Sequence, residues 1–357
     1  MTTQAHHDLL GLDLPRLTRI VEDLGEPGFH ARQIYHWIYA RRAASFAQMT
    51  NLSRALRERL EAAHTLGLSR VLKVEESIDG TRKYLFAPVS GGQVESVYIP
   101  EQRRVTFCIS PQIGCALDCH FCVTARLGFV RNLTPGEIVS QVLALLSDNE
   151  KRTGGRPVNI VMMGMGEALH NYDNAMAAFR LLVDPAGIGI PRRRITFSTA
   201  GLAPGILRLA AEPVRPRLAI SLNATDDRTR SDLMPINRKY PLDTLLAACR
   251  RFPLSPRERI TFEYVLLRGL NDGAADPRRL AALMHRHQLN AKVNLIPFNE
   301  GAAFPFAEPS AETVTRFRDE LLLLGVPASI RSNRGRDISA ACGQLALQGA
   351  TAADPSD

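Results

Sequence analysis

Hydrophobic residues recur with a helical period at the start of the chain. Leu17, Val21 and Leu24 fall on one face of a segment that Asp13 can cap, and this spacing predicts an amphipathic helix. The same period continues to about residue 70. We therefore expect a small, separate helical domain over residues 1–70.

The period changes to two in residues 71–102, where short apolar segments alternate with turn signals. Asp79-Gly80 and Gly91-Gly92 are dipeptides typical of tight turns between strands. The candidate strands are 71–76, 82–86 and 94–99. The pattern predicts a β-hairpin extension over residues 71–102 that leads into the main domain.

From residue 103 to 345, apolar strands alternate with amphipathic helices. One helix is predicted to begin at Thr134-Pro135-Gly136-Glu137, a capping box with proline in its first turn. Such alternation predicts an α/β fold, with a parallel sheet and helices outside it. The candidate strands are 105–110, 158–163, 194–198, 217–222, 260–266 and 292–296, with a seventh at 327–331. Six strands are too few for an eight-stranded barrel, so we favour a partial (β/α)6 barrel over a doubly wound sheet.

Polar residues follow the ends of several candidate strands. They are Cys115, Glu167, Ser198, Asn223 and Asn299. In parallel α/β folds the carboxyl ends of the strands form the active site. We therefore expect these side chains to gather at one edge of the sheet.

Composition narrows the class of protein without naming a reaction. The 357 residues are 45% hydrophobic and 22% charged, as in soluble globular proteins. The longest apolar runs, such as 160–163, are far shorter than a membrane span needs, and residues 1–8 lack the features of a signal peptide. We expect no membrane partner, and a disordered tail over residues 346–357.

The cysteines carry the strongest chemical signal. Four of the six lie within fifteen residues, and in a chain of this length they indicate metal binding or catalysis in a reducing cytoplasm rather than disulfides. Cys115, Cys119 and Cys122 can hold three corners of an iron–sulfur cluster and leave its fourth iron open to a substrate. A structural zinc site completed by His120 is the alternative. A ferredoxin-like carrier would need a fourth cysteine.

This loop, with Phe121 before its last cysteine, resembles the radical S-adenosylmethionine superfamily. Within it, the chain resembles the RlmN/Cfr adenosine methyltransferases from Arg32 to Leu345. The segments that carry the resemblance are 29–39, 112–122, 128–133, 164–167, 198–201, 221–223, 294–299 and 341–345. The resemblance implies a radical-SAM barrel and two cofactors, a [4Fe-4S] cluster and S-adenosyl-L-methionine.

The family methylates a ring carbon of adenine in RNA. That carbon is electron-poor and has no lone pair to attack a sulfonium methyl group, so a radical is needed. The resemblance implies methylation of C2 of one adenosine in 23S rRNA, near the peptidyl-transferase centre, and of the adenosine next to the anticodon in some tRNAs. Methylation of C8, as in Cfr, is the alternative. C2 is favoured because that branch is the more widespread. A non-catalytic RNA-binding protein with a structural cluster, or a radical enzyme acting on another substrate, are further alternatives.

The resemblance also implies a role for particular residues. Cys342 would carry the methyl group, Cys108 would release the covalent RNA adduct and form a disulfide with Cys342, and Glu95 would act as an acid or base. Cys249 matches nothing and is expected in packing. The residues expected to bind S-adenosylmethionine are Gly166, Glu167, Ser198, Ser221, Leu222, Asn223 and Asn299. The chain departs from the family at Ala168, where proline is common, and at Asn223, where some relatives have histidine.

The charge agrees with an RNA substrate. The formal net charge is +8 and the pI is about 9.4, and basic proteins often bind nucleic acid. Arginines expected to hold RNA phosphates lie in the helical domain, around the cysteines and before Cys342. They are Arg32, Arg41, Arg42, Arg103, Arg104, Arg126, Arg131, Arg192, Arg193, Arg194, Arg331, Arg334 and Arg336. The remaining expectations are an electron donor such as flavodoxin, and a monomer.

Overall fold

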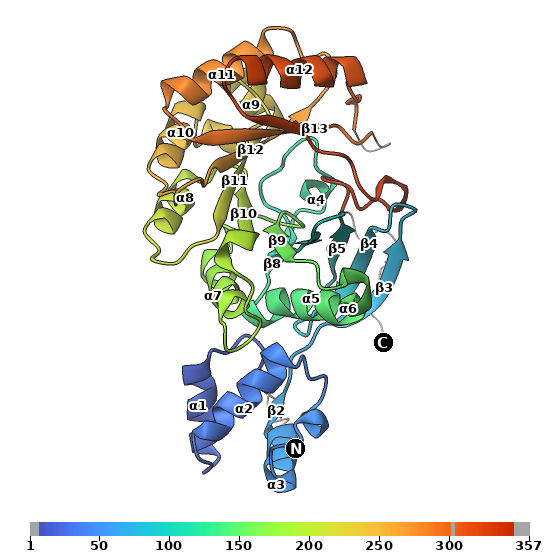
Figure 1. Cartoon of the computed structure of the whole chain (residues 1–357), viewed down its shortest axis with the longest axis vertical. Helices are drawn as coiled ribbons and strands as arrows, with labels where there is room; N and C mark the ends of the chain where they lie inside the picture. Colours follow the sequence, from blue (N-terminus) through green and yellow to red (C-terminus); the bar gives the residue numbers. More distant parts are fainter. Residues whose placement is uncertain (1–6, 301–303, 346–357) are drawn as a thin grey trace.

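One ten-stranded sheet organises most of the molecule (Figure 1). The structure is a computed structural model that describes residues 7–300 and 304–345. The tail expected over residues 346–357 lies outside the described residues. Within them, no helix combines the length and the apolar character needed to cross a bilayer.

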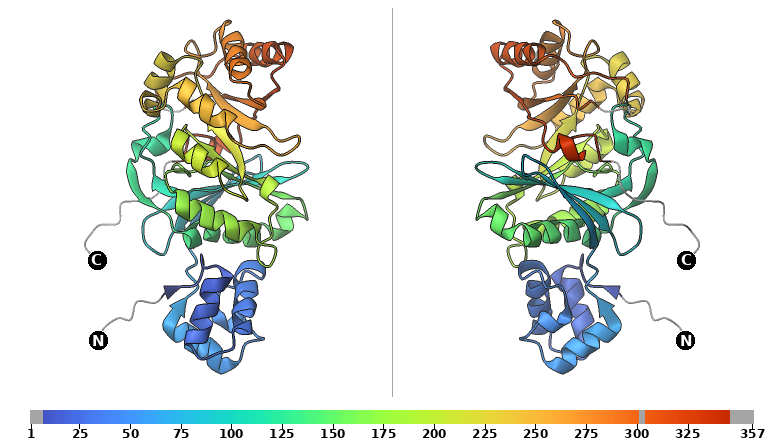
Figure 2. Two further views of the ribbon diagram at one scale, coloured as in Figure 1. Left: turned by 90° about the vertical axis from the view of Figure 1, so that its left-hand side faces the viewer. Right: turned by 90° about the vertical axis from the view of Figure 1, so that its right-hand side faces the viewer.

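The first part of the chain folds as a helical unit at one end of the molecule (Figure 2). In the first helix the Asp13 side chain accepts a hydrogen bond from the Arg16 backbone N–H, and Leu17 and Val21 are buried, as the sequence pattern predicts. The elements are β1 (His7–Asp8), α1 (Leu14–Asp23), α2 (Phe29–Tyr35), η1 (His36–Ala40), η2 (Phe46–Gln48), α3 (Arg54–Ala63) and β2 (His64–Thr65).

Three antiparallel strands join this unit to the rest of the chain. They are β3 (Arg70–Glu76), β4 (Arg82–Ala87) and β5 (Val94–Pro100). The sequence predicts a hairpin extension here, but β5 pairs with β6 (Val105–Cys108), so the three strands continue the main sheet. Pairing with β6 satisfies backbone groups that a free edge would expose.

The parallel part of the sheet confirms the predicted partial barrel. Its strands are β6, β9 (Val158–Met162), β10 (Ile195–Thr199), β11 (Arg217–Ser221), β12 (Ile260–Leu266), β13 (Ala291–Pro297) and β14 (Ala328–Ile330), in the spatial order β14-β13-β12-β11-β10-β9-β6. Among the described strands β14 pairs only with β13, so the barrel is not closed.

Helices cover the outside of this sheet (Figure 1). They are α5 (Pro135–Asp148), α6 (Glu150–Thr153), α7 (Tyr172–Val183), α8 (Ala203–Ala210), α9 (Asp227–Leu233), α10 (Leu242–Arg250), α11 (Asp276–Arg286) and α12 (Ala311–Leu323), with short turns η3 (Arg192–Arg194), η4 (Pro235–Arg238) and η5 (Arg336–Ile338). The capping box that the sequence predicts between Thr134 and Glu137 begins α5. Ile160 and Met162 of β9 are buried, whereas Asn159 and Val161 line a cavity.

A small ladder stands at the carboxyl end of β6. Strands β7 (Gln112–Gly114) and β8 (Phe129–Asn132) pair antiparallel and enclose residues 115–128, which we call the cysteine loop. The loop includes the short helix α4 (Val123–Arg126). The ladder thus fixes both ends of the segment that carries three cysteines.

Candidate active site

The backbone at the start of the cysteine loop requires glycine. Gly114 has φ of +70°, and a Cβ atom there would overlap the Gly128 carbonyl oxygen at the other end of the loop. That oxygen accepts a hydrogen bond of 2.9 Å from the Cys115 backbone N–H. This close approach holds the first and last residues of the loop together.

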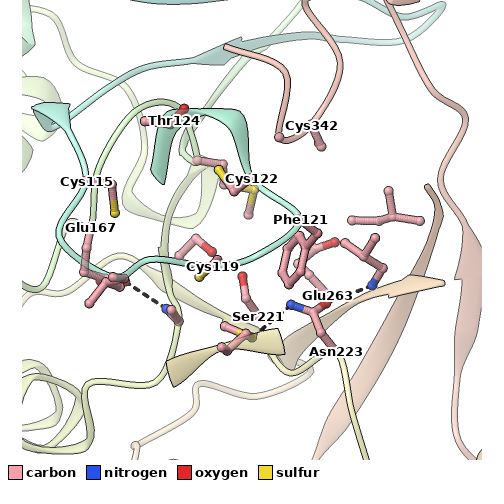
Figure 3. A pocket seen from close by; sticks show the side chains of 18 of the residues that line it. Cys115, Cys119, Phe121, Cys122, Thr124, Glu167, Ser221, Asn223, Glu263 and Cys342 are labelled. Carbon is pink, nitrogen blue, oxygen red and sulfur yellow. Dashed lines mark hydrogen bonds between the residues drawn. The ribbon is translucent and has the colours of Figure 1, made fainter. Parts of the chain in front are cut away.

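The cysteine loop forms one wall of a cavity, which we call the cysteine cavity. Figure 3 shows the three cysteines along the loop and the strand residues across from them. Ten of the residues that the sequence singles out line it. They are Cys115, Cys119, Cys122, Gly166, Glu167, Ser198, Ser221, Asn223, Asn299 and Cys342. Residues from six parts of the chain therefore meet here, at the carboxyl ends of the strands.

The end of the described chain is fastened to the cysteine loop. The Val123 backbone N–H donates to the Gly343 carbonyl oxygen at 2.8 Å, and the Thr124 hydroxyl donates to the Leu345 carbonyl oxygen at 2.8 Å. The Asn299 side-chain amide lies 3.4 Å from the Cys342 carbonyl oxygen. These contacts hold the exposed Cys342 beside three cysteines that precede it by more than two hundred residues.

A second set of contacts holds this C-terminal segment from the other side. The Ser77 hydroxyl donates to the Asp337 carboxylate at 2.6 Å, and the Ile78 backbone N–H donates to the same carboxylate at 3.2 Å. The Gly335 backbone N–H donates to the Asp79 carboxylate at 3.1 Å. The turn between β3 and β4 therefore positions Cys342, a function for the antiparallel strands that the sequence pattern does not reveal.

The donor set of the cysteine loop fits an iron–sulfur cluster. All six cysteines are free thiols, and burial raises the pKa of Cys115 to about 12 and that of Cys119 well above its ordinary value. Thiolates in such a place require bound positive charge, which a metal supplies. No three described histidine, cysteine or acidic side chains converge on one point as ligands of a single ion would. In a cuboidal cluster each thiolate binds a different iron.

Glu167 is held in a fixed orientation. It is buried, and its carboxylate accepts hydrogen bonds from the backbone N–H groups of Leu169 at 3.0 Å and Ala200 at 2.8 Å. Burial raises its pKa to about 7, against the opposing effect of those N–H groups. Gly166 before it has φ of +95°, and a Cβ there would overlap the Gln112 side chain. The turn thus places one carboxylate at the cavity wall.

Two buried acceptors in the cysteine cavity lack hydrogen-bond partners. They are Oδ1 of Asn299 and Oε2 of Glu263, although the latter lies 3.9 Å from Nη1 of Arg331 in an ion pair. Buried polar atoms are normally paired, and an orphaned acceptor in a cavity fits a ligand that brings a donor. The ammonium group of S-adenosylmethionine is such a donor. Glu263 lies within strand β12, and sequence reasoning missed it because a lone acid inside a strand gives no functional signal.

Arg230 is another residue that the sequence pattern does not reveal. This fully buried guanidinium donates to the carbonyl oxygens of Ala200 at 2.7 Å, Ser221 at 3.1 Å and Leu222 at 3.0 Å. Burial lowers its pKa to about 10. It ties the ends of β10 and β11 together. Leu222 itself is buried and does not line the cavity, so only its backbone belongs to the site.

Cys108 and Glu95 lie outside the cysteine cavity. Burial raises the pKa of Cys108 to about 12, with a further contribution from Cys342 and an opposing one from Arg331. The pKa of Arg331 is raised chiefly by Cys342, so these three groups are electrostatic neighbours. Glu95 is buried on β5, with an oxygen 3.4 Å from Nζ of Lys83.

The basic residues are distributed differently from the sequence-based expectation. Arg104 precedes β6 and Arg194 precedes β10, so both lie at the amino-terminal ends of strands, opposite the cysteine loop. Arg131 forms an ion pair of 2.8 Å with Glu137. The expectation that Arg104 and Arg194 flank the cysteines was wrong, because nearness in sequence does not specify which sheet edge a residue joins. Arg131 does lie beside the cysteine loop, on β8.

Comparisons with known proteins agree with this site. Residues 7–66 match the family model of the ribosomal RNA large subunit methyltransferase N-terminal domain, and residues 109–277 match the radical SAM superfamily. A radical SAM methyltransferase from Sphaerobacter thermophilus has the same fold, with a TM-score of 0.90 and 44% identity over 95% of this chain and 99% of its own.

Curated relatives match along nearly the whole chain. The dual-specificity RNA methyltransferase RlmN of Syntrophotalea carbinolica is 48% identical over 339 residues, which are 95% of this chain and 89% of the relative. That of Pelobacter propionicus is 48% identical over 338 residues, covering 95% of both. The cofactors are a [4Fe-4S] cluster and S-adenosylmethionine. The chain belongs to the RlmN family of radical S-adenosylmethionine methyltransferases.

Proposed function

We propose that this enzyme methylates C2 of one adenosine in 23S rRNA, near the peptidyl-transferase centre, and of the adenosine next to the anticodon in some tRNAs. The observation that carries the proposal is the anchoring of Cys342 on the cysteine loop, through the hydrogen bonds of Val123 and Thr124. A protein that only bound a structural cluster would need no exposed cysteine in the same cavity.

The residues proposed to bind the cofactors are residues that line the cysteine cavity. In this proposal Cys115, Cys119 and Cys122 ligate the cluster. When bound, the cluster and S-adenosylmethionine supply the electron, the radical and the methyl group. The orphaned Oδ1 of Asn299 and the oriented carboxylate of Glu167 bind the cationic end of S-adenosylmethionine. The other residues proposed at this cofactor are Gly166, Ser198, Ser221 and Asn223, with the backbone of Leu222.

Four further residues are proposed to act on the methyl group and the RNA. Cys342 carries the methyl group on its sulfur, and its exposure suits contact with a large substrate. Cys108 releases the RNA by attacking the sulfur of Cys342: the disulfide forms as the bond from that sulfur to the carbon attached to the RNA breaks, and the carbon keeps the electron pair and takes a proton. Arg331 interacts electrostatically with both cysteines, and its positive charge favours the Cys108 thiolate that this attack needs. Glu95 is proposed as the acid or base, with Lys83 as its ion-pair partner.

The remaining assignments concern the whole protein. Residues 1–70 are proposed as an accessory domain that contacts RNA, because residues 7–66 match the family's N-terminal domain. The protein is proposed to act as a monomer. Six free thiols support a reducing cytoplasm. The electron donor is proposed to be a flavodoxin-like protein.

The test is mass spectrometry of rRNA and tRNA from a strain that lacks the gene, with and without complementation. Loss of 2-methyladenosine, restored by the wild-type gene but not by a Cys342→Ala variant, is the expected result. Loss of 8-methyladenosine with 2-methyladenosine intact would replace this proposal with the C8 reaction. Unchanged RNA together with normal S-adenosylmethionine cleavage would point to another substrate.

A further inference from the structure

A second cavity lies inside the barrel, at the end opposite the cysteine loop. We call it the basic cavity. Seven of its lining side chains are basic and only Glu101 and Glu263 are acidic. The basic residues are Arg104, Arg193, Arg194, Arg217, Lys292, Arg331 and Arg334. Five of these precede or begin a parallel strand, so they surround the amino-terminal mouth of the barrel.

Part of this positive charge has no counter-charge from the protein. Arg104 forms an ion pair with Glu101. Among the described residues, no carboxylate lies within ion-pair distance of Arg193, which is exposed, or of Lys292, which is partly buried, so both cationic groups are available to an anionic ligand. Burial lowers the pKa of Lys292, and the neighbouring Arg217 and Arg104 lower it further against the effect of Glu263. Arg217, Arg331 and Arg334 each have a carboxylate oxygen only at 3.9 Å, so the seven basic side chains outnumber the carboxylates that face them.

The interior of the barrel connects this mouth with the reactive cysteine. Met163, Glu263 and Arg331 line both the basic cavity and the cysteine cavity, so the two adjoin. Several strands contribute a polar side chain to the wall of the basic cavity. These side chains are Thr106, Asn159, Thr196, Thr261 and Asn294. Barrel interiors are usually filled with branched apolar side chains. A polar, hollow interior instead suits a ligand that forms hydrogen bonds.

We propose that the target nucleotide enters the barrel from this amino-terminal mouth, and that Arg193 and Lys292 hold the phosphates that flank it. The inference rests on the proposed RNA substrate and adds the route by which RNA reaches Cys342. An unstacked nucleotide with phosphates on either side fits a cavity that adjoins the cysteine cavity and carries unpaired cations at its mouth. An acidic electron-donor protein would be drawn to the same charge, but a folded surface cannot fill the polar interior.

The test measures binding of an RNA hairpin that contains the target adenosine to the full-length holoenzyme, by fluorescence anisotropy over a range of salt concentrations. Arg193→Gln and Lys292→Gln each remove one cation and keep much of the side-chain length. The double variant is expected to weaken binding roughly ten-fold or more. It should also reduce the slope of log affinity against log salt by about 1.4, or about 0.7 for each lost phosphate contact.

Control variants distinguish phosphate binding by Arg193 and Lys292 from the effects of a lower net charge or of misfolding. Arg286 is exposed on α11 and lines neither cavity, so Arg286→Gln should leave affinity and slope unchanged. Lys292→Arg should preserve binding because the charge remains. Methylation of Cys342 in the absence of RNA should proceed normally in every variant, which checks that the cofactor site is intact.

The outcomes distinguish the alternatives. Wild-type affinity and slope in the double variant would overturn the proposed route while leaving the RNA substrate in place. Slower cluster reduction by flavodoxin with unchanged RNA binding would overturn it in favour of a donor site. If the wild-type enzyme itself methylates no RNA, the proposed function fails, and the route with it.

Discussion

Replacement of Arg230 tests whether a buried cation holds the active-site edge together. Its guanidinium donates four hydrogen bonds, to three backbone carbonyl oxygens and to the Asn237 side chain at 2.9 Å. An Arg230→Met variant fills most of the volume but leaves these acceptors without a donor. The change therefore isolates the polar contribution from the cost of a cavity.

The magnitude follows from the number and kind of contacts. A hydrogen bond to a charged group contributes about 1.5–3 kcal/mol, and an acceptor left buried and unpaired costs a similar amount. The four bonds share one donor group, so their contributions do not add. Loss of a partner from a buried charged network typically destabilises by about 3–5 kcal/mol. We expect that decrease in the free energy of unfolding, which is a large part of the about 5–15 kcal/mol of a typical domain.

The assay is urea unfolding of anaerobic holoenzyme, followed by far-ultraviolet circular dichroism. The chain's one tryptophan, Trp37, lies in the helical domain, so its fluorescence would report on another part of the molecule. Arg228→Met is the matched control, because Arg228 lies on the same helix and is exposed. Arg230→Met should also weaken S-adenosylmethionine binding, since Ser198 and Ser221 lie on the two strands that Arg230 ties. Stability within about 1 kcal/mol of the control would refute the reasoning.

Three further changes test the loop, the anchor and the thiols. Gly114→Ala should destabilise the protein by about 1–3 kcal/mol through backbone strain and lower the iron content per chain, measured by metal analysis. Asp337→Ala frees the C-terminal segment from the β3–β4 turn, so methylation of Cys342 should slow several-fold while S-adenosylmethionine binding, measured by calorimetry, stays unchanged. At pH 8 iodoacetamide should label the exposed Cys342 first, because burial raises the pKa of Cys108 and Cys249 to about 12 and leaves roughly one thiol in 10⁴ ionised. Labelling of those two should rise about ten-fold per pH unit, as followed by peptide mass spectrometry.

Local patterns were sufficient to predict most elements of this fold. The six candidate strands and the seventh at 327–331 agree with the observed strands to within two residues, because buried parallel strands leave continuous apolar runs. The helix starts at Asp13 and Thr134 follow from side chains that cap their own backbone. Such signals involve only a few neighbouring residues, so they predict an element whatever the tertiary arrangement around it.

Signals that depend on tertiary contact were missed or misplaced. The antiparallel pairing of β3, β4 and β5 agrees with the predicted hairpin region, but the sequence of residues 71–102 does not indicate that β5 also pairs with β6. Arg230 looks like any arginine on a short helix, and only the fold reveals the carbonyl groups that it joins. Glu263 likewise becomes a candidate site residue only because the fold places it in the lining of the cysteine cavity. The residues of the cysteine loop were predictable because their spacing itself encodes the chemistry.

The distribution of charge shows how one barrel can separate its two tasks. The carboxyl ends of the strands carry Glu167 and the cysteine loop, where buried thiols and orphaned acceptors suit a cationic cofactor. The amino-terminal ends carry Arg193 and Lys292, where unpaired cations suit an anionic polymer. Each mouth disfavours the other ligand through charge alone. Arg331 lines both cavities and is an electrostatic neighbour of Cys342. A nucleotide that enters from one mouth and a methyl donor bound at the other would therefore meet next to Cys342.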